Sequence, residues 1–233
     1  MTSAAQITAN LQVIRQRVSA ACGRAGRDLN EVTVLGASKG QPLEHLQWAW
    51  DAGLRVFGEN RVQEGLTKID SLPSETEWHL IGPLQSNKVK KVVPVFAAVH
   101  SIDRPKIARA LDREATRLAR PLLGLLEVNL AEEESKHGFL PAQILDHLPE
   151  LQDLETLNIV GLMAIPPFET DPQHSRKWFC QLRELRDEVF SQEGWQQRPG
   201  YLSMGMSHDY DVAIEEGATH VRIGNALFGP RIG

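Results

Sequence analysis

A lysine directly after an apolar segment is the first feature of this chain that suggests chemistry. Lys39 follows Val32–Ser38, a run with the apolar and β-branched residues of a buried strand. Burial near the end of such a strand penalises the charged ammonium and lowers the pKa of the amine. A neutral amine is the form that condenses with a carbonyl group. Lys39 is therefore a candidate Schiff-base lysine, and a solvated loop lysine is the alternative.

A charged residue interrupts another apolar segment near the end of the chain. Arg222 lies in His220-Val-Arg-Ile-Gly-Asn225. A charge inside a terminal strand needs a partner, which is either a salt bridge within the protein or an acceptor on a ligand. Gly224 and Asn225 follow at once, and the glycine leaves backbone N–H groups accessible to an anion.

The segment Ser203-Met-Gly-Met-Ser207 forms a second turn that could approach a ligand. It ends one predicted strand and precedes a predicted helix. Gly205 permits close backbone approach, and Ser207 offers a hydroxyl near a helix N-terminus, where anions bind. An ordinary strand–helix turn is the alternative. The second turn of this kind at Gly224 favours a phosphate-binding site built from both.

Other polar residues carry weaker signals. His79 is either a pocket residue or a hydrogen-bonded core histidine. The lysines of segment 88–91 are typical of a solvated helix face. Lys136 adds a second amine after the fifth predicted strand, where a plain turn is the alternative. The sequence has no G-x-G-x-x-G, Walker A or H-E-x-x-H motif, so nucleotide and zinc-protease chemistry lacks support.

Strands and helices alternate along the chain after an N-terminal helix, whose apolar residues recur at helical spacing from Ile7 to Val18. The predicted strands are Val32–Ser38, Arg55–Glu59, Trp78–Ile81, Ala97–Ile102, Leu122–Leu130, Leu157–Ile165, Tyr201–Met204 and His220–Ile223. The predicted helices between them are Leu43–Ala52, Val62–Ile69, Lys88–Val93, Lys106–Ala119, Ala142–Leu151, His174–Phe190 and Tyr210–Glu216. Eight units of this kind close into a parallel barrel.

A barrel of this kind places its chemistry at the carboxyl ends of its strands. Residues at the predicted strand ends come from distant parts of the sequence, and they include Lys39, Asn60, Met163, Ser207 and Arg222. We therefore expect these side chains to converge on one mouth of the barrel.

The composition excludes several classes of function. The 233 residues carry a formal net charge of -5, are 42% hydrophobic, and thus suit one α/β barrel rather than a general nucleic-acid-binding surface. The two cysteines lack zinc-ligand spacing, and free thiols are expected. The first ten residues do not resemble a secretory signal, and no apolar run is long enough to span a membrane. We expect a soluble cytoplasmic protein without nucleic-acid or membrane partners.

Seven short blocks, in order from about Val32 to Arg231, resemble the pyridoxal phosphate homeostasis protein family. No single block is specific, but seven in order over nearly the whole chain are. The blocks are Gly36-Ala-Ser-Lys39, Phe57-Gly-Glu-Asn60 with Val62-Gln-Glu64, Trp78-His-Leu-Ile-Gly-Pro-Leu-Gln-Ser-Asn-Lys88, Glu133-Glu-Ser-Lys136, Gly161-Leu-Met-Ala-Ile165, Leu202-Ser-Met-Gly-Met-Ser207, and Val221-Arg-Ile-Gly224 with Phe228-Gly229.

The resemblance implies a fold and a set of contacts. The fold is a single (β/α)8 TIM barrel like the N-terminal domain of alanine racemase, a fold-type III pyridoxal 5′-phosphate (PLP) barrel without the C-terminal β domain. The lysine matching Lys39 holds PLP as a Schiff base, and the arginine matching Arg222 contacts the pyridine nitrogen. The residues matching Ser207 and Gly224 help to hold the phosphate, and those matching Asn60 and Met163 line the pocket.

The chain departs from the family pattern at two places. Gly40 and Gln41 follow the cofactor lysine where members often have a threonine and a second lysine, and Asn225 stands where threonine is common. Asn225 can still donate to a phosphate, so the departure bears on the geometry of that contact. The predicted cofactor contacts are Lys39, Asn60, His79, Met163, Ser203, Gly205, Ser207, Arg222, Gly224 and Asn225, with no catalytic residue and no metal ligand.

The function that the resemblance implies is cofactor binding without efficient catalysis. We expect one domain over residues 1–233, with residues 1–27 as a helix packed on the barrel. It would act as a monomer that buffers PLP or delivers it to apo-enzymes. The alternatives are an amino-acid racemase or related fold-type III enzyme, and a class I aldolase with a Schiff-base lysine. Lys39 on the first strand fits the PLP proteins better, by analogy of fold alone.

Overall fold

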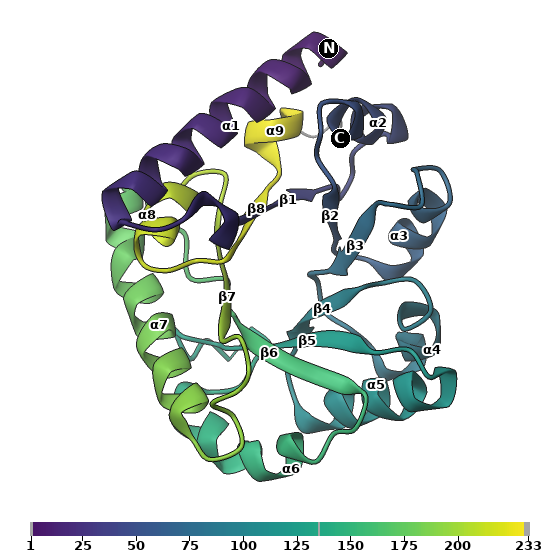
Figure 1. The fold of residues 1–233 in the computed structure, drawn as a ribbon, viewed down its shortest axis with the longest axis vertical. Coiled ribbons are helices and arrows are strands. Elements are labelled where there is room, and N and C mark those ends of the chain that lie inside the picture. Colours follow the sequence, from purple (N-terminus) through teal and green to yellow (C-terminus); the bar gives the residue numbers. More distant parts are fainter. Residues whose placement is uncertain (1, 135, 231–233) are drawn as a thin grey trace.

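Eight parallel strands close into a barrel, and the helices lie around its outside (Figure 1). The computed structural model describes residues 2–134 and 136–230. Each strand pairs with the next one in the sequence, and β8 returns to β1. The strands are β1 (Thr33–Ala37), β2 (Val56–Glu59), β3 (Glu77–Leu80), β4 (Ala98–Ile102), β5 (Leu122–Glu127), β6 (Leu157–Met163), β7 (Tyr201–Met206) and β8 (His220–Ile223). The predicted (β/α)8 barrel is confirmed.

The helices follow the predicted order. They are α1 (Ala4–Ala25), α2 (Leu43–Asp51), α3 (Val62–Ile69), α4 (Val89–Val92), α5 (Pro105–Leu118), α6 (Leu148–Gln152), α7 (Arg176–Ser191), α8 (Tyr210–Glu215) and α9 (Asn225–Phe228), with 3-10 turns at Leu29–Glu31, Ser86–Lys88, Pro141–His147 and Pro172–Ser175. The helix predicted over 142–151 is α-helical only from Leu148. Pro149 stands in the first turn of α6, where its missing N–H costs nothing, but in mid-helix it would break the ladder.

The helix α1 packs against the outside of the barrel. Ser3 caps its start by accepting the N–H of Gln6 at 3.2 Å, and Gly26 ends it in the left-handed conformation, with φ 65°. Asn10 Nδ2 donates to the carbonyl oxygen of Leu227 at 2.9 Å, so α1 fastens α9 to the body of the protein. Figure 1 shows α1 running past α8 and α9. Its buried face is formed by Ile7, Leu11, Ile14 and Val18.

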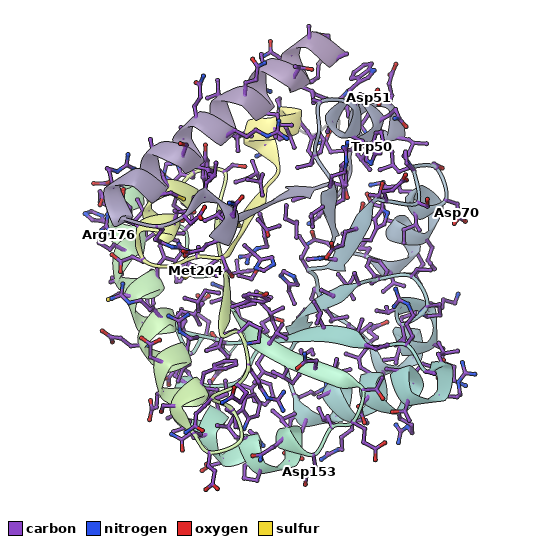
Figure 2. The ribbon with its side chains drawn as sticks, viewed as in Figure 1. Trp50, Asp51, Asp70, Asp153, Arg176 and Met204 are labelled. Atoms are coloured by element: carbon purple, nitrogen blue, oxygen red, sulfur yellow. The ribbon has the colours of Figure 1, made fainter. Side chains whose placement is uncertain are left out.

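The interior of the barrel is divided into an apolar and a polar half. Figure 2 shows side chains occupying the space inside the strands. Leu125, Val160 and Met163 form a buried apolar cluster on β5 and β6. The strands on either side of β5 and β6, namely β3, β4, β7 and β8, hold the buried polar groups His79, His100, Ser203 and Arg222. Barrels of this class usually fill their interior with branched apolar side chains. Polar groups in that position must be hydrogen-bonded to be tolerated.

Three further observations concern the part of the chain that the structure describes. None of its helices has the length and apolar character needed to cross a membrane. It contains no group of three or more His, Cys, Asp or Glu side chains placed to hold a metal ion. Cys22 and Cys180 are both free thiols.

Candidate functional site

A cavity of about 280 Å³ opens at the carboxyl end of the barrel. We call it the mouth cavity. Its walls come from the segments that follow β1, β2, β3, β6, β7 and β8, which lie far apart in the sequence. The predicted contact residues that line it are Lys39, Asn60, Ser207, Arg222, Gly224 and Asn225. The strand ends thus converge as a barrel requires.

The backbone on both sides of Lys39 is held by hydrogen bonds. Ser38 is fully buried, and its N–H donates to the carbonyl oxygen of Gly58 at 2.9 Å. The N–H of Gly40 donates to Glu64 Oε1 at 2.6 Å. Lys39 itself is partly buried and lines the mouth cavity. These bonds fix the backbone from Ser38 to Gly40, which we call the stem of Lys39, and the amine extends from this stem to the mouth cavity.

A second lysine, Lys68 on α3, holds this stem from behind. Its Nζ donates to the carbonyl oxygen of Ser38 at 2.8 Å, to Glu59 Oε1 at 2.6 Å and to Glu64 Oε1 at 2.7 Å. Ser38 Oγ also donates to Glu59 Oε1, at 2.6 Å. All three ammonium protons of Lys68 have partners, which a buried cation needs. Burial raises the pKa of Glu59, while the hydrogen bonds from Lys68 and Ser38 oppose that rise.

The two glycine-containing turns meet as predicted. Ser207 Oγ accepts the N–H of Gly224 at 3.1 Å and the N–H of Ala226 at 3.2 Å. Gly205 has φ 86°, and a Cβ there would lie 2.5 Å from the Cβ of Ala213, so only glycine fits this turn. The result is a group of backbone donors around one hydroxyl at the edge of the mouth cavity. Such a group of N–H donors suits an anion.

Arg222 lies deep in the mouth cavity and is only 4% exposed. Its Nη1 donates to Ser203 Oγ at 2.7 Å, and its Nη2 donates to the carbonyl oxygen of Ala164 at 2.8 Å. Within the described residues, no carboxylate oxygen lies within 4.0 Å of this guanidinium, so the alternative of an internal salt bridge is not seen. Burial lowers the pKa of Arg222 to about 10, although Glu127 and Asp209 act in the opposite direction. The side chain remains a cation with N–H donors to spare.

Four predicted contact residues do not line the mouth cavity. Met163, Ser203 and Gly205 are buried. His79 lies further from the mouth, where it lines a second cavity of about 670 Å³ with Glu77 and His100. His79 on β3 lines this second cavity, whereas Ile81 lines the mouth cavity, so the structure does not support the predicted contact of His79. His79 is therefore not among the cofactor contacts proposed below.

Several residues of the site were not predicted from the sequence. Glu59, Glu64 and Lys68 support Lys39 without contacting the cavity. The spacing of Glu64 and Lys68, four residues apart on a helix, is a signal that could have indicated the pair. An aspartate two residues before Pro105 also predicts that Asp103 caps α5, but Arg104 occupies the capping position and pairs with the Asp103 carboxylate. Additional residues that line the mouth cavity are Gln41, Ile81, Ile165, Phe168, Met206 and His208.

A carboxyl group at the end of β5 has unusual properties. Burial and, to a smaller extent, the nearby Asp103 raise the pKa of Glu127 to about 7, against the opposing effect of Arg222. Glu127 Oε2 and Asp103 Oδ1 are both buried without a hydrogen-bond partner among the described residues. An anionic Glu127 is therefore poorly compensated.

Comparison with known proteins assigns the family. The family described as "Alanine racemase, N-terminal domain" matches residues 3–231. A pyridoxal phosphate homeostasis protein of Aquifex aeolicus (strain VF5) is 44% identical over 222 residues, which cover 95% of this chain and 96% of that protein. The protein of the same name from Escherichia coli (strain K12) is 39% identical over 232 residues, or 97% of each chain. This chain belongs to the pyridoxal phosphate homeostasis protein family.

Solved structures support this assignment. PipY of Synechococcus elongatus PCC7942, solved with PLP bound, has a TM-score of 0.84 and 37% identity, and the match covers 96% of this chain and 100% of that one. The alanine racemase of Bartonella henselae, with covalently bound pyridoxal phosphate, has a TM-score of 0.74 at 14% identity and covers 98% of this chain and 60% of that one. The second similarity shows a shared fold and nothing further.

Proposed function

We propose that this protein binds PLP in the mouth cavity and buffers it or delivers it to other proteins, without efficient catalysis of its own. One observation carries the proposal. A candidate Schiff-base amine on Lys39, the buried cation Arg222 and the turns around Ser207 and Gly224 all line the same cavity. The proposal is supported by the names of the full-length relatives and by the PLP found in PipY.

Each residue has a role that follows from its chemistry. When bound, PLP supplies three groups, which are an aldehyde, a pyridine nitrogen and a phosphate. The aldehyde condenses with a primary amine. The amine of Lys39 is the partner of the aldehyde. Arg222 can only donate, so it suits a ring nitrogen that accepts a hydrogen bond and stays unprotonated. Ser207, Gly224 and Asn225 surround the place proposed for the phosphate.

The racemase alternative requires a second acid/base group opposite the lysine. Both tyrosines of the chain are accounted for in the structure. Tyr201 lines the second cavity at the far end of the barrel. The ring of Tyr210 is buried beneath the guanidinium of Arg17, 4.5 Å from its centroid. Neither tyrosine lines the mouth cavity, which favours a binding protein over a racemase.

The test of the proposal is to locate the amine that binds the cofactor. Purified protein is incubated with PLP, reduced with borohydride and digested, and the peptides are weighed. We expect the added cofactor mass on the peptide that contains Lys39. Lys136, which pairs with Glu133 at 2.7 Å, is the matched control, and Lys136→Ala should retain the label. A label on Lys136 alone would contradict the assignment, and no label on any lysine would contradict PLP binding.

Delivery is tested separately. The loaded protein is mixed with an apo-enzyme that uses PLP, and recovery of activity is timed against the same concentration of free PLP. Delivery is supported if activity recovers faster with the loaded protein than with free PLP, or if the two rates depend differently on concentration. Equal rates at every concentration leave buffering as the role. The recipients, the monomeric state, the cytoplasmic location and the extent of the domain stay predictions from the sequence.

A further inference from the structure

A continuous chain of hydrogen bonds runs through the polar half of the barrel interior. Arg222 Nη1 lies 2.7 Å from Ser203 Oγ, and Ser203 Oγ lies 2.8 Å from His100 Nδ1. His100 Nε2 lies 2.9 Å from His79 Nδ1, and His79 Nε2 lies 2.8 Å from Glu77 Oε1. We call these residues, Arg222, Ser203, His100, His79 and Glu77, the barrel column. It begins at the mouth cavity and ends at the second cavity.

The two ends of the barrel column determine where its protons lie. The Glu77 carboxylate can only accept, so His79 Nε2 carries a proton. In a neutral imidazole the other nitrogen is then an acceptor, so His79 Nδ1 accepts a proton donated by His100 Nε2. His100 Nδ1 must in turn accept the hydroxyl proton of Ser203. Ser203 Oγ then accepts from Arg222, which has no other option than to donate. Every bond of the column points from the guanidinium towards the carboxylate.

The surroundings of the column favour this neutral arrangement. Burial lowers the pKa of His100 well below its usual 6.5, and the neighbouring His79, His220 and Arg222 lower it further. The hydrogen bond from His79 lowers the pKa of Glu77 against the opposing effect of burial. The two ends of the column are thus a guanidinium and a carboxylate, and burial favours a neutral His100 ring between them.

A buried polar chain of this kind needs a reason to exist. An apolar interior would satisfy the barrel equally well, as Leu125 and Val160 on the adjacent strands β5 and β6 show. A polar group that loses its partner in such a place costs free energy, because water cannot replace the partner. Each hydrogen bond of the column is therefore needed to keep the others satisfied. The result at the mouth cavity is that the Arg222 guanidinium is held in one place.

We propose that Ser203, His100, His79 and Glu77 are positioning residues, which fix the Arg222 guanidinium so that its free N–H groups face the mouth cavity. The planar fork of arginine is rigid, so fixing Nη1 on Ser203 and Nη2 on the carbonyl oxygen of Ala164 sets the direction of the remaining donors. This inference rests on the proposed function only for what Arg222 would contact, namely the ring nitrogen of PLP.

The first test needs no cofactor. Long-range ¹⁵N–¹H NMR on the unloaded protein reports which nitrogen of each imidazole carries a proton. We expect the proton on Nε2 and a bare Nδ1 in both His79 and His100 at neutral pH. A proton on Nδ1 of either ring, or two protons on either ring, would contradict the direction of the column and overturn the proposal.

The second test links the column to the cofactor. Ser203→Ala should shift the absorption band of bound PLP in the same direction as Arg222→Lys and weaken PLP binding about 5-fold, the factor for one hydrogen bond of ordinary net strength. Ser203→Thr retains a hydroxyl and should restore the band. His220→Phe is the matched control. His220 packs against the ring of His100, with centroids 5.5 Å apart, but has no hydrogen bond to the column, so the variant should leave the band unchanged.

The outcomes separate the two proposals. If wild-type protein takes up no PLP, the proposed function fails, while the NMR experiment still decides the column. If wild type binds PLP and Ser203→Ala leaves the band in place, or His220→Phe shifts it as much, the column does not position Arg222. If Ser203→Ala does not fold, Ser203→Thr and the tautomers in the wild-type protein still decide the question.

Discussion

Lys68 Nζ lies 2.6 Å from Glu59 Oε1 in an ion pair that is buried directly behind the amine proposed to hold the cofactor. The two side chains are 9% and 0% exposed, and neither lines the mouth cavity. The pair nevertheless reaches both backbone neighbours of Lys39, through the carbonyl oxygen of Ser38 and through Glu64. A structural ion pair thus fixes the stem of a functional residue.

Removing one member of this pair should be costly. Lys68→Met leaves two carboxylates without their shared cation, and we expect a loss of about 3–5 kcal/mol in the free energy of unfolding. Urea denaturation measures the loss. The exposed Lys90 offers a matched control, because Lys90→Met should change stability by no more than about 0.5 kcal/mol. Equal effects of both variants would mean that the Lys68 pair contributes nothing by its burial.

Arg222→Glu should change the absorption spectrum of bound PLP. A carboxylate in this place would favour a protonated ring nitrogen, whereas a guanidinium favours an unprotonated one. The spectra of wild type and variant, each saturated with PLP at the same pH, provide the comparison. Identical spectra would show that Arg222 does not contact the ring.

The phosphate should supply much of the affinity. Pyridoxal lacks the anion that suits the N–H groups of Gly224 and Ala226, and each lost hydrogen bond to a charged group is worth about 1.5–3 kcal/mol. We therefore expect pyridoxal to bind at least about 10-fold more weakly than PLP. Ser207→Ala should narrow this difference, since Ser207 Oγ organises both N–H groups. Fluorescence titration of both ligands measures it. Similar affinities for PLP and pyridoxal would show that these N–H groups do not bind the phosphate.

Glu127 should make stability depend on pH. Its folded pKa is about 7 against a usual 4.5, and a raised carboxyl pKa stabilises the fold fully below 4.5 and loses that contribution as the pH rises through 7. A shift of about 2.5 units corresponds to about 3 kcal/mol. Glu127→Gln cannot ionise, so it should gain about 2–3 kcal/mol relative to wild type between pH 5 and pH 8. Chemical denaturation at both pH values checks this. If the difference in unfolding free energy between variant and wild type were the same at both, the pKa of Glu127 would not be raised by the fold.

Loaded protein should not exchange the Cα proton of amino acids rapidly. Lys39 can serve one face of a substrate carbon, and no tyrosine lines the mouth cavity to serve the other. Incubation with individual L- and D-amino acids in deuterated water, followed by NMR, measures the exchange. Turnover of about 1 per second or more would favour the racemase. The exposed His208 lines the cavity, so loss of such turnover in His208→Ala would identify the second group.

Much of the fold was predictable because its signals are local. Eight apolar strands alternate with seven predicted helices, and a parallel barrel is the arrangement that buries both faces of such strands. The mouth residues Lys39, Ser207 and Arg222 were predictable for the same reason, since each lies near or just after the carboxyl end of a strand. The short α9 was not predicted, because four residues carry no helical period.

Other parts of the site depend on direction and depth, which sequence spacing does not give. His79 and Ile81 both face inward from the third strand segment, and only their height in the barrel separates the two cavities. The bond between Ser203 and His100 joins residues 103 positions apart. No pattern along one element indicates such a pair, because the role of each residue depends on its partner on another strand.

The order of the site residues along the chain has a consequence for biosynthesis. Lys39 and its supports are complete by residue 68, whereas the donors around Ser207 and Gly224 come from β7 and β8, and α1 can fasten Leu227 only after these strands are in place. Chains are made from the N-terminus and fold as they emerge. In a ribosome-bound chain, the amine of Lys39 is therefore present long before the phosphate site at Ser207 and Gly224 has formed. Firm capture of the ligand has to wait for the closure of the barrel, so uptake of PLP by stalled chains of increasing length would time that closure.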